Sequence, residues 1–255
     1  MTIRIAMWSG PRNLSTAMMR AFENRADCVV SDEPFYAAYL AATGLDHPMR
    51  AEVLQSQPTA WHDVATQLAG PLPRNAEDAP TAIWYQKHMT HHMLPEFGLD
   101  WMGSFRHAFL IRAPARVLNS YVAKREAVTL TDIGLVRQVE LFDRFADDTG
   151  AAPPVVDSDD VLNNPEGMLR SLCTALALPF DRAMLHWPKG RRASDGVWAP
   201  AWYGSVEQST GFTAPAGAGL PSLPEPLQRI ADAALPYYER LAAYRIAVQP
   251  AGLHE

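Results

Sequence analysis

The sequence contains little cysteine, no excess of positive charge and no long apolar run. Its 255 residues include two cysteines, Cys28 and Cys173, which are too few for a disulfide framework and indicate a reducing compartment. A formal net charge of −6 argues against broad binding to nucleic acid or to an anionic membrane. No apolar run is long enough to cross a bilayer, and an apolar strand starts almost at Met1, so we expect neither a membrane span nor a secretory signal. These absences predict a cytoplasmic protein.

The composition is typical of a globular chain, with 48% hydrophobic and 20% charged residues. A length of 255 residues suits one large α/β domain or two small ones, and we predict a single domain over residues 1–255. The proline-rich stretch 44–80 is too short to bury a core of its own, so it is predicted to form a lid or insertion within that domain, with one helix at 60–69. Nothing in the sequence indicates a homo-oligomer.

Apolar strands alternate with amphipathic helices along the chain. The predicted strands cover residues 2–9, 27–35, 81–89, 107–114 and 153–162. The predicted helices cover residues 15–25, 115–126, 132–150, 164–180 and approximately 227–244. Gly150 is expected to end the third of these helices, and Asn164 is expected to cap the fourth. The alternation predicts an α/β fold of three layers, in which helices flank a central, mainly parallel sheet.

Charged side chains follow three of the predicted strands at their carboxyl ends. Asp32 and Glu33 follow the second strand. Lys87 and His88 end the third strand, and Arg112 ends the fourth. The carboxyl ends of parallel strands meet at one edge of an open sheet, and ligands bind there. The sequence therefore predicts an active site at this edge.

The first strand runs into the loop GPRNLST at residues 10–16, which opens a helix. A Walker A loop would carry glycine and lysine where Ser15 and Thr16 stand, and the nearby cation is Arg12. The free N–H groups at the start of the helix still favour an anion. Gly10 is expected to let the backbone approach a ligand, and Ser15 or Thr16 is expected to cap the helix. The segment is therefore a phosphate loop of another kind or an ordinary capped turn.

A second anion site is predicted from Arg112 and Ser120. An unpaired guanidinium at the end of a buried strand is costly, and Ser120 lies eight residues further on, in the next helix. That helix can return Ser120 to the strand end, where both side chains would donate to one phosphate. The alternative is a salt bridge at the strand end beside an unrelated serine.

The order of these motifs resembles that of the sulfotransferases that use 3′-phosphoadenosine-5′-phosphosulfate (PAPS), over about residues 5–200. The family loop P-[KR]-S-G-T-T aligns with Pro11, Arg12, Asn13, Leu14, Ser15 and Thr16. The resemblance implies that Arg12 contacts the sulfuryl group of the donor, and that Arg112 and Ser120 bind its 3′-phosphate. It also implies a P-loop-like fold, PAPS as the donor substrate, a small-molecule acceptor with a hydroxyl or amine group, and no required metal.

The resemblance extends to a late, cation-rich loop. Lys189 and Gly190 match the family loop that closes over the 3′-phosphate, but Pro188 stands where that loop has arginine. Arg191 or Arg192 is left to supply this charge, and the sequence does not decide which. The resemblance thus adds four candidates to the donor site without ordering them.

The resemblance does not account for the adenine of the donor. Ala17 stands where family members often carry an aromatic residue that stacks on the base, so another part of the chain must supply that contact. Trp198 and Trp202 lie beside the cation-rich loop and are candidates for ligand contact.

Three residues compete for the role of catalytic base. Lys87 matches a family lysine that stabilises the transferring group, but Met89 stands where the family has histidine. His88 and His91 are the nearby histidines, and the ordinary pKa of histidine suits proton transfer. Glu33, or the acid before it, is the third candidate, because an acid at that strand end is the base in some relatives.

The histidines at 88, 91 and 92 also have the spacing of a metal site. Neither a CxxC nor an HExxH pattern accompanies them, so we predict no metal and expect His92 to be a packing residue.

Sulfuryl transfer from PAPS is the leading hypothesis for the function. A P-loop kinase or other phosphoryl transferase is an alternative that needs a loop lysine, which is missing, and a strand-end aspartate, for which Asp157 is a poor substitute. A non-catalytic nucleotide-binding protein that keeps the anion site and lacks the base is the other alternative.

Overall fold

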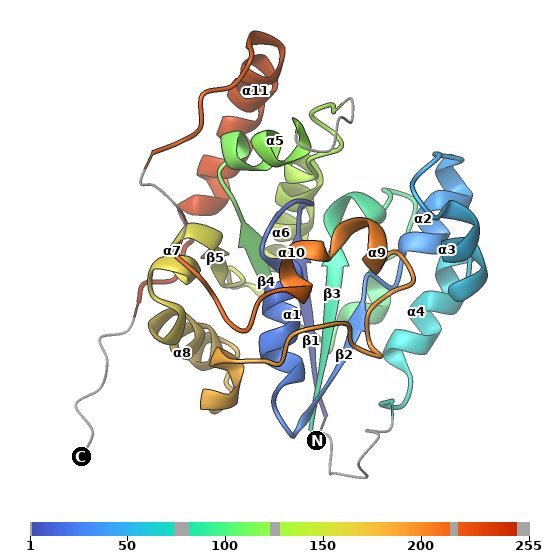
Figure 1. Cartoon of the computed structure of the whole chain (residues 1–255). Helices are drawn as coiled ribbons and strands as arrows, with labels where there is room; N and C mark the ends of the chain where they lie inside the picture. Colours follow the sequence, from blue (N-terminus) through green and yellow to red (C-terminus); the bar gives the residue numbers. More distant parts are fainter. Residues whose placement is uncertain (1, 74–81, 123–127, 215–218, 249–255) are drawn as a thin grey trace, which may run out of the picture.

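The described part of the chain contains a sheet of five short strands. In a computed structural model, the described residues are 2–73, 82–122, 128–214 and 219–248. The strands are β1 (Ile3–Ser9), β2 (Cys28–Asp32), β3 (Ile83–Met89), β4 (Arg106–Ile111) and β5 (Val155–Asp157). They pair in the order β2-β3-β1-β4-β5, and every pair is parallel (Figure 1). β1 therefore lies at the centre, and the carboxyl ends of the strands meet at one edge.

Alternate residues of each strand pack against helices on opposite faces of the sheet. One face carries Trp8 and Phe109 and is covered by α4, α5, α6 and α11. The other face carries Met7 and Tyr85 and is covered by α1, α7 and α8. These helices are α1 (Ser15–Glu23), α4 (Trp61–Ala69), α5 (Pro114–Val122), α6 (Leu135–Thr149), α7 (Ser158–Asn163), α8 (Pro165–Ala175) and α11 (Glu225–Ala242). The predicted three-layer α/β fold with a central parallel sheet is confirmed.

Short helices and turns complete the described part of the chain. They are α2 (Tyr36–Thr43), α3 (Arg50–Ser56), η1 (Thr90–His92), η2 (Asp100–Met102), η3 (Arg182–Leu185), α9 (Ala199–Trp202) and α10 (Gly204–Glu207). The stretch 44–80 holds α3 as well as the predicted helix at 60–69, and its described side chains Val53 and Val64 are buried in clusters shared with the rest of the fold. Positions 74–80 lie outside the described residues. Within the described segments, no helix combines the length and apolarity needed to cross a membrane.

Two helix ends match the sequence prediction, whereas β2, β4 and β5 end before the predicted strands do. Gly150 ends α6 in a left-handed conformation with φ 69°. The side chain of Asn164 caps α8 by accepting from a backbone N–H of the first turn at 3.0 Å. The strand predicted at 153–162 is wrong in its length, because β5 ends at Asp157. The Asp157 carboxylate accepts from the Asp159 N–H at 2.8 Å and caps α7, so the chain turns from strand to helix there.

Candidate functional site

A cavity of about 970 Å³ opens at the carboxyl edge of the sheet. Its walls come from the loop after β1, from segments that follow β2, β3 and β4, and from residues between 202 and 213. The predicted site residues that line it are Pro11, Arg12, Asn13, Leu14, Ser15, Thr16, Glu33, Lys87, His91, Arg112 and Ser120. The predicted site residues that do not line it are Gly10, His88, Lys189, Gly190, Arg191 and Arg192. The structure thus brings the strand ends together and leaves the late loop outside.

Packing and side-chain hydrogen bonds shape the loop between β1 and α1. A Cβ on Gly10 would lie 2.5 Å from the carbonyl oxygen of Ile133, so glycine here serves packing rather than the predicted approach of a ligand. Arg12 has a positive φ of 55°, a conformation that costs about 1–3 kcal/mol for a residue with a side chain. The Asn13 side chain donates to the Leu110 carbonyl at 3.1 Å and accepts from the next N–H at 2.7 Å. These contacts hold the strained loop against β4.

Helix α1 presents an uncapped N-terminus to the cavity. Its N-cap is Leu14, which makes no side-chain cap, so the prediction that Ser15 or Thr16 caps the helix is wrong. Both hydroxyl residues instead lie in the first turn and line the cavity. The first turn carries no acidic residue. Its free N–H groups and the helix dipole therefore favour an anion in the cavity.

Arg12 and Arg112 meet beside this helix end without a carboxylate partner. The Arg12 Nε donates to the Ser120 hydroxyl at 2.9 Å, and the Arg112 Nη1 donates to the Arg12 carbonyl at 2.5 Å. Among the described residues neither guanidinium forms an ion pair, and the buried Nε of Arg112 has no hydrogen-bond partner. Burial lowers the pKa of Arg112, the charges of Asp159 and Asp157 oppose this, and the charges of Arg116 and Arg12 add to it. An anion bound between these side chains would offset that cost.

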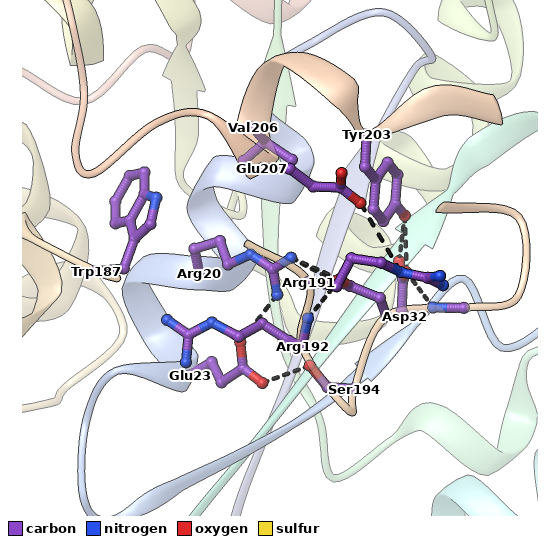
Figure 2. A network of polar contacts seen from close by, with 12 residues as sticks. Arg20, Glu23, Asp32, Trp187, Arg191, Arg192, Ser194, Tyr203, Val206 and Glu207 are labelled. Carbon is purple, nitrogen blue, oxygen red and sulfur yellow. Dashed lines mark hydrogen bonds and ion pairs between the residues drawn. The ribbon is translucent and has the colours of Figure 1, made fainter. Parts of the chain in front are cut away.

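Lys87 belongs to a second charged group, in which each partner is supplied by the protein. Its Nζ lies 2.8 Å from Asp32 Oδ1, 2.7 Å from Glu33 Oε1 and 2.6 Å from Tyr203 Oη. The Tyr203 hydroxyl also lies 2.8 and 2.7 Å from the two Asp32 oxygens (Figure 2). An ammonium group has three hydrogens, and each of them has a partner here. The contact to a donor predicted for Lys87 would therefore require one of these bonds to break.

Glu33 is the carboxylate of this group that lines the cavity. Burial raises the pKa of Glu33, the charge of Lys87 opposes the rise, and the charge of Asp32 adds to it. On balance, the pKa of Glu33 is raised. The backbone at Glu33 has an unusual φ of 40°. A carboxyl group with a raised pKa at a cavity wall is suited to accept a proton near neutral pH.

The neighbouring histidines lie in different environments. His88 stacks on Trp8 with 4.6 Å between ring centroids, and its Nε2 lies 3.1 Å from Gln86 Oε1. Burial lowers the pKa of His88 to about 3, and the ring does not line the cavity, so this geometry argues against His88 as the base. His91 and His92 do line the cavity, and burial lowers the pKa of His91 to about 4. A ring with that pKa is a weaker base at neutral pH than an ordinary histidine.

The late loop lies on the outer side of α1 and α10. Figure 2 shows Arg191 beside Glu207 and Arg192 beside Glu23, with nitrogen–oxygen distances of 3.9 and 4.0 Å. Lys189 is exposed on the same segment. Arg191 and Arg192 therefore lie near protein carboxylates, and none of the three cations lines the cavity with the arginine pair.

Residues between 202 and 213, which follow the late loop, line the cavity where the late loop was expected. Most of these residues were not predicted from the sequence. Trp202, predicted as a ligand-contact candidate, lines the cavity, whereas Trp198 is buried below it. Phe212 also lines it and packs edge-on against Trp187 at 5.1 Å. A backbone bond from Trp187 to Thr210 holds this segment at 3.1 Å. The available signal was the run of aromatic residues Trp198, Trp202 and Tyr203.

The described residues assemble neither of two alternative sites, a metal site built from histidines and the magnesium-binding site of a kinase. No group of three His, Cys, Asp or Glu side chains among them has the arrangement of a metal site. Asp157, the substitute for a kinase aspartate, caps α7 and accepts from the Tyr238 hydroxyl at 2.7 Å. It does not line the cavity, so the kinase alternative finds no support in its position.

Comparison with known proteins gives a match over most of the chain. The family described as "Sulfotransferase domain" matches residues 3–245. Two Arabidopsis thaliana proteins are similar in sequence: branched-chain-amino-acid aminotransferase-like protein 1 is 38% identical over 213 residues, and protein 2 is 35% identical over 212 residues. Each match covers 83% of this chain, but 37% and 36% of the plant proteins. The chain thus spans a little over a third of the length of these relatives.

Solved structures share the fold. The sulfotransferase domain from the curacin biosynthetic pathway has a TM-score of 0.54 and 16% identity, and the match covers 97% of this chain and 99% of that chain. The sulfotransferase domain of the Synechococcus PCC 7002 olefin synthase has a TM-score of 0.53 and 17% identity, with coverage of 91% and 94%.

Proposed function

The chain belongs to the sulfotransferase domain family, and we propose that it transfers a sulfuryl group from PAPS to a hydroxyl or amine group of a small-molecule acceptor. One observation carries the proposal. An uncapped helix N-terminus and two guanidiniums without ion pairs, Arg12 and Arg112, line one cavity of the described structure. PAPS carries a phosphosulfate and a separate 3′-phosphate, so it has one anionic group for each of these features.

The two anionic groups of the donor are assigned to neighbouring parts of the cavity. In this proposal the phosphosulfate binds to the first turn of α1 and to Arg12. Both follow the central strand β1. Arg112 and Ser120 bind the 3′-phosphate, and the Arg12 side chain that donates to Ser120 links the two positions. Leu162 and Phe212 line the cavity and supply apolar surface for adenine, in place of the aromatic residue that the opening loop lacks.

Glu33 is proposed as the catalytic base. It accepts the proton of the acceptor group while the acceptor oxygen or nitrogen forms a bond to sulfur. The bond from sulfur to the bridging phosphate oxygen breaks, and 3′-phosphoadenosine 5′-phosphate (PAP) leaves with the electron pair. Arg12 and the N–H groups of α1 stabilise the charge on the departing phosphate. Lys87 holds Glu33 in place at 2.7 Å and acts through it.

Binding of PAP tests the donor site. We expect PAP at 100 times its Kd to stabilise the protein by about 2.7 kcal/mol in the absence of magnesium. ATP with magnesium should raise the melting temperature far less, because ATP has no 3′-phosphate for Arg112. Stabilisation by ATP with magnesium, and not by PAP, would favour a phosphoryl transferase instead.

Transfer of labelled sulfate from PAPS to a panel of alcohols and amines tests the reaction. Glu33→Gln keeps the shape of the side chain and removes the base, so we expect normal PAP binding and a transfer rate lower by about 10²–10⁴-fold. If the wild-type protein binds PAP and labels no acceptor, the chain is a nucleotide-binding protein without this activity.

A further inference from the structure

The cavity divides into two halves along the order of the strands. Arg12 and Arg112 follow β1 and β4 and belong to one half. The other half is here called the acceptor lobe, and it is lined by Glu33, Tyr36, Tyr39, Asp46, His47, His91, His92 and Asp132. All but the last of these follow β2 or β3, which lie on the opposite side of β1 from β4. Asp132 precedes α6, and its charge acts on His91 and Tyr39.

Aromatic rings form a continuous wall in the acceptor lobe. The His92 ring stacks on Tyr36 at 4.5 Å and on Tyr39 at 4.8 Å between centroids. The His91 and His92 rings meet edge-on at 4.3 Å. The Tyr36 hydroxyl lies 2.9 Å from Nδ1 of His47. These contacts hold the rings in place before a ligand binds, so His92 has the packing role predicted for it and is also part of the wall.

The acceptor lobe offers polar atoms that accept hydrogen bonds. The Nδ1 atoms of His91 and His92 are buried without a hydrogen-bond partner among the described residues, and that of His92 lies 3.9 Å from Glu33 Oε2. Burial lowers the pKa of both rings, which favours the neutral form, and a neutral ring keeps one nitrogen as an acceptor. The carboxylates of Glu33 and Asp132 add further acceptor oxygens. A ligand group that donates several hydrogen bonds would satisfy these atoms.

Negative charge in the acceptor lobe exceeds positive charge. Glu33, Asp46 and Asp132 line it, and Lys87 is the cation at this part of the wall among the described residues. Lys87 is shared between Asp32 and Glu33, so one positive charge faces two carboxylates there. Asp46 and Asp132 add two more negative charges, with no ion pair to a described side chain. An anionic acceptor would be repelled by this lobe.

We propose that the acceptor carries a positively charged amine, which binds to the carboxylates and ring faces of the acceptor lobe. Ammonium groups donate hydrogen bonds and are attracted both to carboxylates and to aromatic faces. The reacting hydroxyl of the same molecule then lies beside Glu33. That this molecule accepts a sulfuryl group rests on the proposed function. The charge preference of the acceptor lobe can be measured by ligand binding with or without a donor.

Three benzyl alcohols of nearly equal size test this charge preference. 4-(Aminomethyl)benzyl alcohol is a cation at pH 7, 4-methylbenzyl alcohol is neutral, and 4-(hydroxymethyl)benzoate is an anion. Their Kd values are measured by ligand-observed NMR, with and without saturating PAP. We expect the cation to bind about fivefold more tightly than the neutral alcohol, and the anion to bind most weakly, as expected for partly exposed carboxylates. The preference should decrease as salt is added.

A double variant tests whether the carboxylates cause the preference. Asp46→Asn and Asp132→Asn remove two charges, and asparagine at 132 keeps the oxygen that accepts from the Thr129 N–H at 2.8 Å. We expect the ratio between the Kd values of the neutral and cationic alcohols to fall to about 1, because the charge term is removed. Asp147→Asn changes an exposed aspartate of α6 that does not line the cavity, so it is the matched control and should leave the ratio unchanged.

Equal binding of the three alcohols, tightest binding of the anion, or no binding by any of them at millimolar concentration would overturn the proposal. A protein that binds PAP and shows no preference for the cation would keep the sulfotransferase proposal and lose this one. A protein that prefers the cation and does not bind PAP would keep the charge preference and lose the assignment as a sulfuryl acceptor.

Discussion

Two groups of buried charge lie at the same edge of the sheet, and they are completed in different ways. In the first, the ammonium group of Lys87 has a partner for each hydrogen, supplied by Asp32, Glu33 and Tyr203. In the second, two guanidiniums lie beside an uncapped helix end, and neither forms an ion pair with a described carboxylate. Both groups contain a cation that the sequence assigned to the donor.

The difference separates a binding site from the wall that supports it. A buried charge costs free energy unless it is paired and hydrogen-bonded. The Lys87 group meets that condition within the protein, so its role is to fix Glu33 at the cavity. The arginine pair lacks an ion pair within the protein, since its hydrogen bonds go to the Ser120 hydroxyl and the Arg12 carbonyl, so a bound anion would complete it. The unpaired group therefore marks the donor site in our proposal.

Removal of Lys87 should have the largest effect on stability. Lys87→Met leaves two carboxylates buried without their cation, and breaking a buried ion pair in this way costs about 3–5 kcal/mol. The free energy of unfolding from urea denaturation measures the loss. Lys189→Met is the matched control, because Lys189 is exposed, and it should change stability by less than about 0.5 kcal/mol. A loss below about 1 kcal/mol for Lys87→Met would show that the first group is not completed by pairing.

Removal of Arg112 should have little effect on the stability of the free protein. Arg112→Met takes away a buried guanidinium without an ion pair, so the free energy of unfolding should change by less than about 1 kcal/mol. The stabilisation of about 2.7 kcal/mol by PAP should be lost, because the 3′-phosphate has lost its cation.

Thermal unfolding with and without PAP measures both parts of the Arg112→Met prediction. Arg229→Met, on the exposed face of α11, serves as the matched control and should keep the response to PAP. If Arg112→Met still responds to PAP, the assignment of the 3′-phosphate site is wrong. If it unfolds as readily as Lys87→Met, the two groups do not differ as described.

Local spacing was sufficient to predict that the loop at 11–16, Arg112 and Ser120 lie at one edge of the sheet, where they line one cavity. The loop at 11–16 and the separation of Arg112 from Ser120 depend on one βα unit each, and a helix of this length returns Ser120 to its strand end. The fold could be predicted for the same reason, because strands and helices alternate along the chain. One exception was the end of β5 at Asp157. There the Asp157 carboxylate accepts from the N–H of Asp159 and starts α7.

The Lys87 group could not be predicted in this way. Its partners come from the end of β2 and from Tyr203 at the start of α10, and Tyr203 lies 116 residues further along the chain. A lysine at a strand end looks free for a ligand when its partners are unknown, so the sequence assigned it to the donor. The contacts of the late loop could not be predicted either, since Arg192 lies beside Glu23, which is far away in sequence.

Tyr203→Phe makes the smallest chemical change of these tests, the loss of one hydroxyl. Tyr203→Phe removes one hydroxyl that donates within the Lys87 group, and hydrogen bonds to charged groups contribute about 1.5–3 kcal/mol each. The hydroxyl also lowers the pKa of Glu33, so its loss should raise that pKa further. Glu33 acts deprotonated in our proposal, and the acid limb of kcat/KM should therefore move to higher pH.

Urea denaturation and a pH profile of transfer measure the two effects of Tyr203→Phe, and Tyr237→Phe on α11 is the matched control. A loss of stability with an unchanged acid limb would mean that Tyr203 supports the wall without affecting the base. A shift of the acid limb with normal stability would mean that the hydroxyl lowers the pKa of Glu33 but is not needed to hold Lys87 and Asp32 in place. Both effects together would show that the paired group positions and tunes the base at once, as an assembly completed within the protein should.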